Sequence, residues 1–258
     1  LEDRIESLKT VVFQQKLGSM YDKSVRVSVL AGYIAEQTGS DKSEAERAGM
    51  LSRCDLMTEM VGEFASMQGV MGRYQAQRDG ETEQIALAME EFYMPRHSGD
   101  ELPQTPAGIA ISLAEKLDTL VGIFGIGMKP TGDKDPFALR RAALGALRIL
   151  REHSLALDIP QLLEITAKPL EPRQENKQAA KDVYAFMLER LKGLLAEEGI
   201  SSQLFDSVAA VRPVNISDFD HRIHAVQQFQ ALPEAEALAA ANKRIRNILK
   251  KVETPVAD

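Results

Sequence analysis

The chain has 258 residues, of which 44% are hydrophobic and 27% charged, a composition typical of a globular protein with one large or two ordinary domains. Its one cysteine, Cys54, excludes an internal disulfide and a cysteine-based zinc site, and it favours a reducing compartment. No apolar run reaches the roughly 18 residues that a membrane-spanning helix needs. The start at Leu1, without a leader sequence, is typical of a fragment of a longer protein.

Charge is unevenly distributed along the chain, whose formal net charge is −7. Residues 1–125 carry 12 Lys and Arg against 20 Asp and Glu, whereas residues 126–258 carry 19 against 18. The second half is therefore better suited than the first to an anionic partner.

Helical periodicity dominates the first half of the chain. The apolar spacing predicts helices over residues 3–17, 23–39, 41–65, 80–93 and 107–124, and Gly18 and Gly39 are expected to end the first two. Gly, Pro and Asp cluster in residues 96–106, which predicts a loop. No segment shows a convincing strand or hairpin pattern, and the palette of Leu, Ala, Ile, Val and Met favours helices, so we expect an all-α fold.

The second half begins with a loop rich in Gly and Pro at residues 125–136. This loop is the best candidate for a domain boundary, which divides the chain into residues 1–128 and 129–258. Beyond it the pattern predicts helices over residues 137–153, 177–199, 224–232 and 233–252, with a break at residues 210–222.

The helix predicted at residues 137–153 carries a stripe of arginines. Asp135 is a good N-cap and Pro136 suits the first helical position. At about 100° per residue, one sector of the helix holds four arginines together with Phe137 and Leu144, and the opposite sector is apolar. The arginines are Arg140, Arg141, Arg148 and Arg151. Three alternatives are open for the stripe. It is a solvated face paired with nearby acids, a face that meets the acidic first half, or a face that contacts phosphates.

Two other groups of cations also allow either a structural role or contact with phosphates. Lys129 and Lys134 lie in the glycine-rich loop before this helix, where backbone N–H groups can hold a phosphate, although no Walker motif is present. A second basic strip lies near the end of the chain and comprises Lys243, Arg244, Arg246, Lys250 and Lys251. It is interpreted either as favourable charge at a helix C-terminus or as a nucleic-acid contact.

No catalytic constellation is apparent in the sequence. His221 and His224 could share a helical face, but few further ligands lie near them, so we expect no metal site there. Asp118 is a carboxylate within an apolar helix, and the expected role of such a residue is a hydrogen-bonded acid of the core or of a groove.

Several blocks of the sequence together resemble the beta subunit of bacterial glycyl-tRNA synthetase. They include AGMLSRCDLMTEMVGEF, QGVMGRYQAQRDGE, EEFYMPRHSGDELP and ANKRIRNILKK, and the most specific is LAEKLDTLVGIFGIGMKPTGDKDPFALRRAALGALRIL, where Glu115 stands in place of the family's usual Asp. The resemblance implies a cytoplasmic alpha–beta heteromer that attaches glycine to its tRNA. It also implies that ATP and Mg²⁺ are used through the alpha subunit, that the beta subunit binds glycine tRNA, and that this fragment itself uses no cofactor.

The resemblance further implies a degenerate HD-like helical domain, followed by a helical region that leads into a truncated anticodon-binding helical bundle. An active HD phosphohydrolase needs metal-binding His and Asp residues. Ser52 and Arg53 stand where the His-Asp pair would be, and Asp118 alone matches. We therefore expect no hydrolysis and no bound metal, and Arg53 is expected either to neutralise Asp118 or to meet a phosphate.

Three functions follow as hypotheses. The first is a non-catalytic, tRNA-binding part of glycyl-tRNA synthetase, with the expected contacts at Lys129, Lys134, Arg140, Arg141, Arg148, Lys243, Arg244 and Arg246. The second is a metal-dependent HD-type phosphohydrolase. The third is a purely structural helical module that joins subunits without binding RNA.

Overall fold

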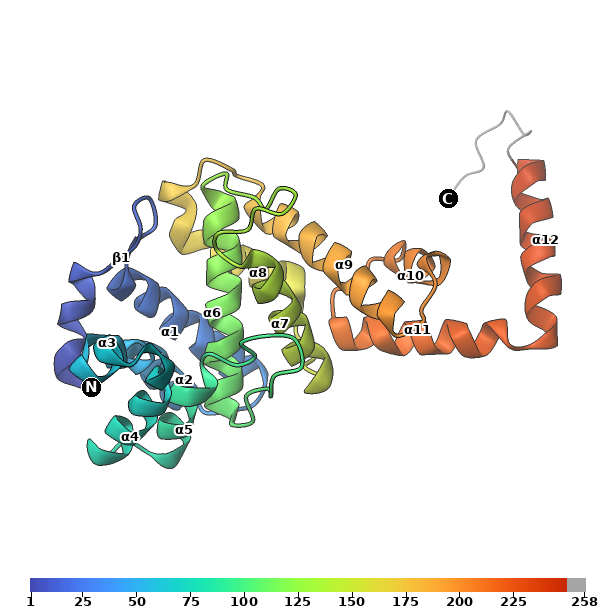
Figure 1. Ribbon diagram of the computed structural model, residues 1–258. Helices are drawn as coiled ribbons and strands as arrows, with labels where there is room; N and C mark the ends of the chain where they lie inside the picture. Colours follow the sequence, from blue (N-terminus) through green and yellow to red (C-terminus); the bar gives the residue numbers. More distant parts are fainter. Residues whose placement is uncertain (250–258) are drawn as a thin grey trace.

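The computed structural model describes residues 1–249, and within them the fold is almost entirely helical, as the composition predicts (Figure 1). The α-helices are α1 (Met20–Gln37), α2 (Lys42–Leu51), α3 (Glu59–Glu63), α4 (Val70–Arg78), α5 (Glu83–Glu91), α6 (Pro106–Gly125), α7 (Leu139–Glu152), α8 (Ile159–Ala167), α9 (Ala179–Glu197), α10 (Ser202–Ala209), α11 (Ile216–Gln230) and α12 (Pro233–Leu249). Short 3-10 helices are η1 (Glu2–Arg4), η2 (Glu6–Thr10), η3 (Cys54–Met57), η4 (Ala65–Met67) and η5 (Lys168–Arg173). None of the described helices is both long and apolar enough to cross a membrane.

Helix α6 is the centre of the fold. Thr105 caps its first turn, Pro106 follows at the first helical position, and nearly every residue after it is buried, as expected of a helix that is apolar on all sides. Helices α1, α2 and α5 pack against α6, and so do α7, α8 and α9 (Figure 1). The apolar core therefore contains residues from both sides of residue 128. The domain boundary expected at that residue stays a prediction.

The C-terminal helices extend away from this core. Helices α9, α10 and α11 pack on one another, and α12 projects beyond them (Figure 1). Within α12, Ala235 is the one buried residue of those described. Helix α12 consequently has little apolar packing of its own.

The helix predicted for residues 3–17 is wrong. The chain forms η1 and η2 and then an antiparallel hairpin of β1 (Val12–Gln14) and β2 (Gly18–Ser19). The Gln14 side chain accepts hydrogen bonds from the backbone N–H groups of Lys16 and Leu17, and Gly18 adopts a φ of +94° that favours glycine. Local hydrogen bonding and the Gly18 turn thus replace the helical ladder.

The single helix predicted for residues 41–65 is also wrong, because α2 ends at Leu51. There the Ser52 hydroxyl donates to the Gly49 carbonyl oxygen at 2.9 Å, and η3, α3 and η4 follow as separate short pieces. Thr58 starts one of these pieces by accepting a hydrogen bond from the Val61 N–H.

Two predictions in the second half need correction. The break at residues 210–222 is shorter than predicted, because Asn215 caps α11, which begins at Ile216. Helix α7 begins at Leu139 rather than Phe137, because Ala138 has a left-handed backbone. Asp135 still caps this helix, since its carboxylate accepts hydrogen bonds from the N–H groups of Leu139 and Arg140.

Candidate functional site

A buried network of charges joins α1 to α6. The Lys23 ammonium lies 3.0 Å from an Asp118 oxygen and 3.3 Å from a Glu115 oxygen, and Arg26 Nε lies 2.6 Å from the other Asp118 oxygen. Burial raises the pKa of Asp118, but Lys23 and Arg26 outweigh it and hold the pKa below its usual 3.8. Asp118, predicted as a hydrogen-bonded acid of the core or of a groove, is therefore an ionised partner of two cations.

The other two positions named by the resemblance lie at the end of α2. Ser52 is buried against Gly49, and the guanidinium of Arg53, which is 4% exposed, pairs with Glu115. The expectation that Arg53 neutralises Asp118 is thus corrected, because Asp118 lies one turn further along α6 and Lys23 and Arg26 already neutralise it.

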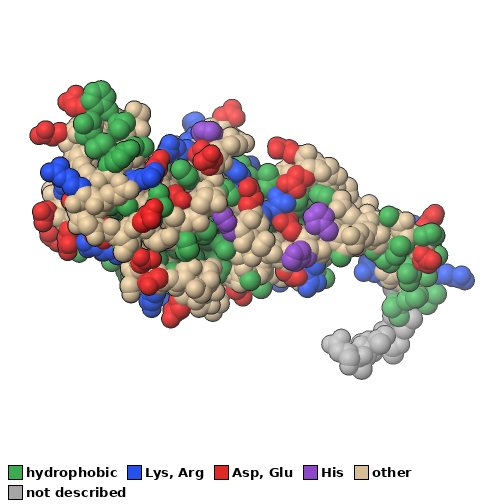
Figure 2. Space-filling view, turned by 90° about the horizontal axis from the view of Figure 1, so that it is seen from below, with side chains coloured by type: hydrophobic (Ala, Val, Ile, Leu, Met, Phe, Trp, Pro, Cys, Tyr) green, Lys and Arg blue, Asp and Glu red, His purple; other side chains and the backbone are tan. Residues whose placement is uncertain are grey.

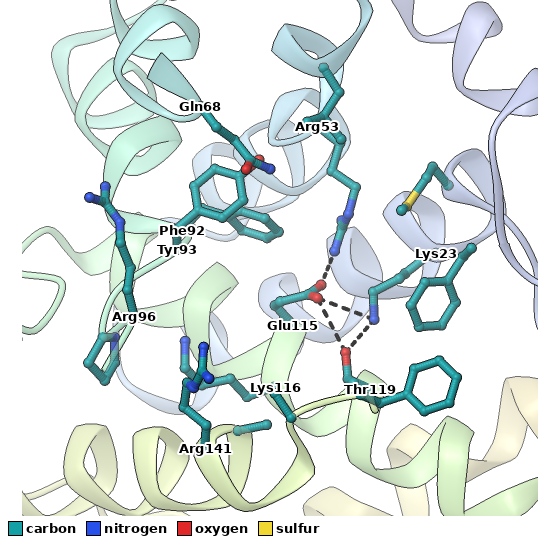
Figure 3. Close-up of a pocket in the computed structure, with 17 residues that line it drawn as sticks. Lys23, Arg53, Gln68, Phe92, Tyr93, Arg96, Glu115, Lys116, Thr119 and Arg141 are labelled. Atoms are coloured by element: carbon teal, nitrogen blue, oxygen red, sulfur yellow. Dashed lines mark hydrogen bonds and ion pairs between the residues drawn. The ribbon is translucent and has the colours of Figure 1, made fainter. Parts of the chain in front are cut away.

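A cavity of about 400 Å³ lies beside this network, and Figure 3 shows how its lining residues converge. It is open to solvent and is lined by the β1 hairpin, the start of α1, the segment after α2, Gln68, the segment after α5, one face of α6 and the start of α7. Among the described residues that line it, Glu115 is the one acid, and the five cations are Lys23, Arg53, Arg96, Lys116 and Arg141. The lining is strongly positive even though it lies largely in the acidic half of the chain.

Burial and neighbouring charges shift the pKa values of two titratable groups in the cavity, Glu115 and Lys116. Burial raises the pKa of Glu115, but Arg53 and Lys23 outweigh it and lower the pKa below 4.5. Burial lowers the pKa of Lys116 to about 8. The Lys116 ammonium donates hydrogen bonds to the Met94 carbonyl oxygen and to Ser112 Oγ, each at 2.7 Å.

The sequence of α6 contains a signal for this cavity. Glu115, Lys116 and Asp118 are three charged residues in an otherwise apolar helix, and charges in such a helix require partners. Of the cavity cations, Arg141 was named as a site residue and Arg53 as a degenerate position. Lys23, Arg96 and Lys116 were missed, because their convergence depends on contacts between distant segments.

The arginine stripe of α7 is divided between internal contacts and solvent. Arg151 pairs with Glu198 at 2.8 Å and with Asp220 at 2.7 Å. Arg148 pairs with Glu152 at 2.9 Å and also donates to the Asp100 carbonyl oxygen. These acids lie in the second half of the chain, so the acidic first half supplies no carboxylate to these two arginines.

The other two arginines of the stripe have no carboxylate partner among the described residues. Arg140 is half-buried and donates to the Gly132 carbonyl oxygen. Arg141 is exposed at the rim of the cavity. Two arginines of the stripe are therefore paired with acids, and phosphate contact by the stripe stays a prediction.

The remaining predicted contacts lie in the loop before α7 and on α12. Lys129 pairs with Asp182 at 2.7 Å, whereas Lys134 is exposed in the turn it forms with Thr131. On α12, the side chains of Lys243, Arg244 and Arg246 are exposed. Figure 2 shows cations on the sides of the projecting end that α12 forms. Lys250 and Lys251 of the same strip lie outside the described residues.

The histidines do not form a ligand cluster. His221 and His224 lie exposed on α11. Within residues 1–249, no group of three or more His, Cys, Asp or Glu side chains is placed to hold a metal ion. That the chain takes no metal and no cofactor stays a prediction.

Comparison with known proteins identifies relatives of this chain. A family model described as "Glycyl-tRNA synthetase beta subunit" matches residues 1–210. A glycine–tRNA ligase beta subunit of Pseudomonas putida (strain W619) is 55% identical over 258 residues, which are 100% of this chain and 38% of the relative. The beta subunit of Ectopseudomonas mendocina (strain ymp) is 53% identical over 257 residues, with the same shares.

A third relative gives the same result. The glycine–tRNA ligase beta subunit of Actinobacillus pleuropneumoniae serotype 5b (strain L20) is 52% identical over 257 residues, which are 100% of this chain and 37% of the relative. The chain thus spans well under half the length of the curated relatives it matches. With a family match over most of its residues and high identity over its whole length, the chain belongs to the glycyl-tRNA synthetase beta subunit family.

Proposed function

We propose that this chain contributes tRNA binding and subunit architecture to a heteromeric glycine–tRNA ligase. Its partners in this proposal are glycine tRNA and the alpha subunit, which carries the adenylating site and uses ATP and Mg²⁺. The chain itself is non-catalytic and takes no cofactor, and the complex works in the cytoplasm. Family membership supports the assignment to a glycine–tRNA ligase complex as its beta subunit.

The observation that carries the proposal is a set of exposed cations without carboxylate partners among the described residues. They are Lys134, Arg141, Lys243, Arg244 and Arg246. Lys129 and Arg148 are already ion-paired, so we expect them to contribute less to RNA binding. Exposed, unneutralised cations release counterions from a phosphate backbone when they bind it, whereas paired cations must first exchange partners.

A non-catalytic role is supported by the charges at the positions where an HD-type enzyme would hold metal. Asp118 already has two cationic partners, Lys23 and Arg26, and the adjacent Glu115 is shared by Arg53 and Lys23. A carboxylate neutralised in this way has little affinity left for a divalent cation.

Binding of glycine tRNA to this chain across a salt series tests the proposal. We expect affinity to fall as salt rises. In the double variant Arg244→Gln/Arg246→Gln, we expect the slope of log K against log salt to decrease by on the order of 0.7–0.9 for each cation removed. The matched control is Arg78→Gln, which removes an exposed cation at the end of α4, far from α12 (Figure 1).

The outcomes separate the three hypotheses. A loss in the α12 variant with an unchanged control supports the proposal. Binding that the α12 variant leaves unchanged contradicts the contacts proposed here. Absence of RNA binding, with tight association to the alpha subunit, favours the purely structural module, and metal-dependent phosphate release would favour the phosphohydrolase.

A further inference from the structure

The cavity beside the middle of α6 has more positive charge than its own acid can neutralise. Arg53 and Lys23 share Glu115, and Lys23 also pairs with Asp118. The other three cations, Arg96, Lys116 and Arg141, have no carboxylate partner among the described residues of the cavity. Three unneutralised cations around one concavity favour an anion with more than one charge.

Two buried donors of the same cavity lack an acceptor. Arg53, which is 4% exposed, has no hydrogen-bond partner for its Nη1 among the described residues. The Tyr93 hydroxyl lies beside Gln68 but forms no hydrogen bond of good geometry with a described residue. Both side chains line the cavity, and Figure 3 shows them on the side opposite Lys116 and Arg141. Because a buried donor without an acceptor is costly, these groups indicate that an occupant supplies acceptors there.

The packing around Lys116 keeps its charge at the cavity. The side chain crosses Gly145 of α7, where an added Cβ would lie 2.8 Å from Lys116 Cε. Its ammonium is held by neutral oxygens of Met94 and Ser112 rather than by a carboxylate. An anion bound next to it would stabilise the protonated form that burial disfavours.

An aromatic wall adjoins these cations. The rings of Phe92 and Tyr93 meet edge to face with centroids 4.8 Å apart, and the Arg53 guanidinium lies 4.7 Å from the Phe92 ring. Phe13 and Phe137 also line the cavity. A volume of about 400 Å³ suits a small ligand, and aromatic walls favour a planar ring.

We propose that this cavity binds a nucleoside monophosphate group, with the phosphate at Arg96, Lys116 and Arg141 and the base against the aromatic wall. A phosphate monoester carries up to two negative charges and three acceptor oxygens, which matches the three unneutralised cations. Arg53 Nη1 and the Tyr93 hydroxyl donate to the base or ribose. A free mononucleotide and the 5′-phosphorylated end of an RNA strand offer this same chemistry.

Calorimetric titration with adenosine 5′-monophosphate tests the proposal, with adenosine and inorganic phosphate titrated separately. We expect the mononucleotide to bind at least tenfold more tightly than either part. Arg96→Gln is expected to weaken it at least fivefold, and Tyr93→Phe is expected to weaken it without lowering thermal stability. Both variants are checked by circular dichroism, and Arg78→Gln is the matched control with an exposed cation elsewhere.

A second arm compares a short RNA with a 5′-phosphate and the same RNA with a 5′-hydroxyl. If the phosphorylated strand binds with the same dependence on Arg96, the natural source is an RNA end. If the mononucleotide alone shows that dependence, the source is a free nucleotide. The proposal is overturned if neither probe binds, if binding ignores Arg96→Gln, or if inorganic phosphate binds as tightly as the nucleotide.

The cavity and the proposed tRNA surface share Arg141, so residues that belong to only one of them are used to separate the two proposals. Arg96 belongs to the cavity and not to the predicted tRNA contacts, whereas Arg244 and Arg246 lie on α12. Loss of mononucleotide binding in Arg96→Gln, with tRNA binding retained, separates the cavity from that surface. Conversely, retained mononucleotide binding in Arg244→Gln/Arg246→Gln, with tRNA binding weakened, shows that the α12 surface is separate from the cavity.

Discussion

Lys23 is a charged residue that the fold buries almost completely. The side chain is 1% exposed, and its ammonium depends on carboxylates that α6 supplies. Pairing in a buried site adds little stability relative to a well-packed apolar core, yet removal of one partner strands the other charge. We therefore expect the network to add little net stability as a whole, whereas loss of any one member should destabilise the fold.

Asp118→Asn tests this dependence. The change leaves Lys23 and Arg26 without their shared carboxylate, so we expect the free energy of unfolding to fall by about 3–5 kcal/mol at neutral pH. Because the folded pKa of Asp118 lies below the usual 3.8, its ionic contribution is complete above that value and is lost as pH falls through the folded pKa. Urea unfolding at neutral and acid pH measures both effects.

The matched control is Asp218→Asn, which breaks an exposed i,i+4 pair with Arg222. Its expected cost is less than about 1 kcal/mol. Equal losses in the two variants, or a difference that does not shrink in acid, would contradict the role given to the buried network.

At the residue scale, the sequence predicted the environment of Asp118 but not its partners. A carboxylate in an apolar helix must be satisfied, which is why a hydrogen-bonded acid of the core or of a groove could be expected. Lys23 lies 95 positions earlier in the chain, and local residue spacing cannot predict a contact between residues so far apart in sequence. The same reason explains why Arg53 was expected to meet Asp118 and meets Glu115.

Among the elements, α1 and α2 make an unusually close approach. A Cβ added at Gly49 of α2 would lie 2.5 Å from the Ser28 Cα of α1, which is backbone and cannot move aside. We expect Gly49→Ala to lower the free energy of unfolding by about 1–3 kcal/mol or more, because the two helices must separate. Denaturant unfolding monitored by circular dichroism measures the change.

Gly62→Ala is the control for that experiment. Gly62 lies in α3, and nothing lies within 4 Å of an added Cβ there. Alanine favours the helix over glycine, so we expect an unchanged or slightly higher stability. A loss at Gly62 as large as that at Gly49 would argue against steric crowding as the cause.

The observed helices and strands also show which sequence patterns predict secondary structure correctly. The helix predicted at residues 107–124 is confirmed as α6 within one residue at each end, because its apolar run is long and Thr105 and Pro106 mark its start. The prediction for residues 3–17 failed because Gln14 and Gly18 stabilise a hairpin that apolar spacing does not reveal. Helices α4, α8 and α10 are short, at eight or nine residues, and were not predicted.

At the scale of the whole molecule, α12 differs from the core. It has 17 residues but buries Ala235 alone among those described, and its apolar residues Leu238, Ile245 and Ile248 are exposed. Helices that lack tertiary packing are marginal in water near this length. We expect the amide hydrogens of α12 to exchange far faster than those of α6, as measured by hydrogen–deuterium exchange with mass spectrometry. Equal protection in the two helices would show that α12 belongs to the cooperative core.

The central position of α6 has a consequence for synthesis on the ribosome. Helices α1, α2 and α5 emerge first, but the helix against which they pack ends at Gly125, and Lys23 leaves the ribosome 95 residues ahead of Asp118. Until α6 emerges, Lys23, Arg26 and Arg53 lack the carboxylates that α6 supplies, and α1, α2 and α5 lack the helix against which all three pack. The segment before α6 is therefore expected to stay incompletely folded and to reach its final packing only after α6 has emerged.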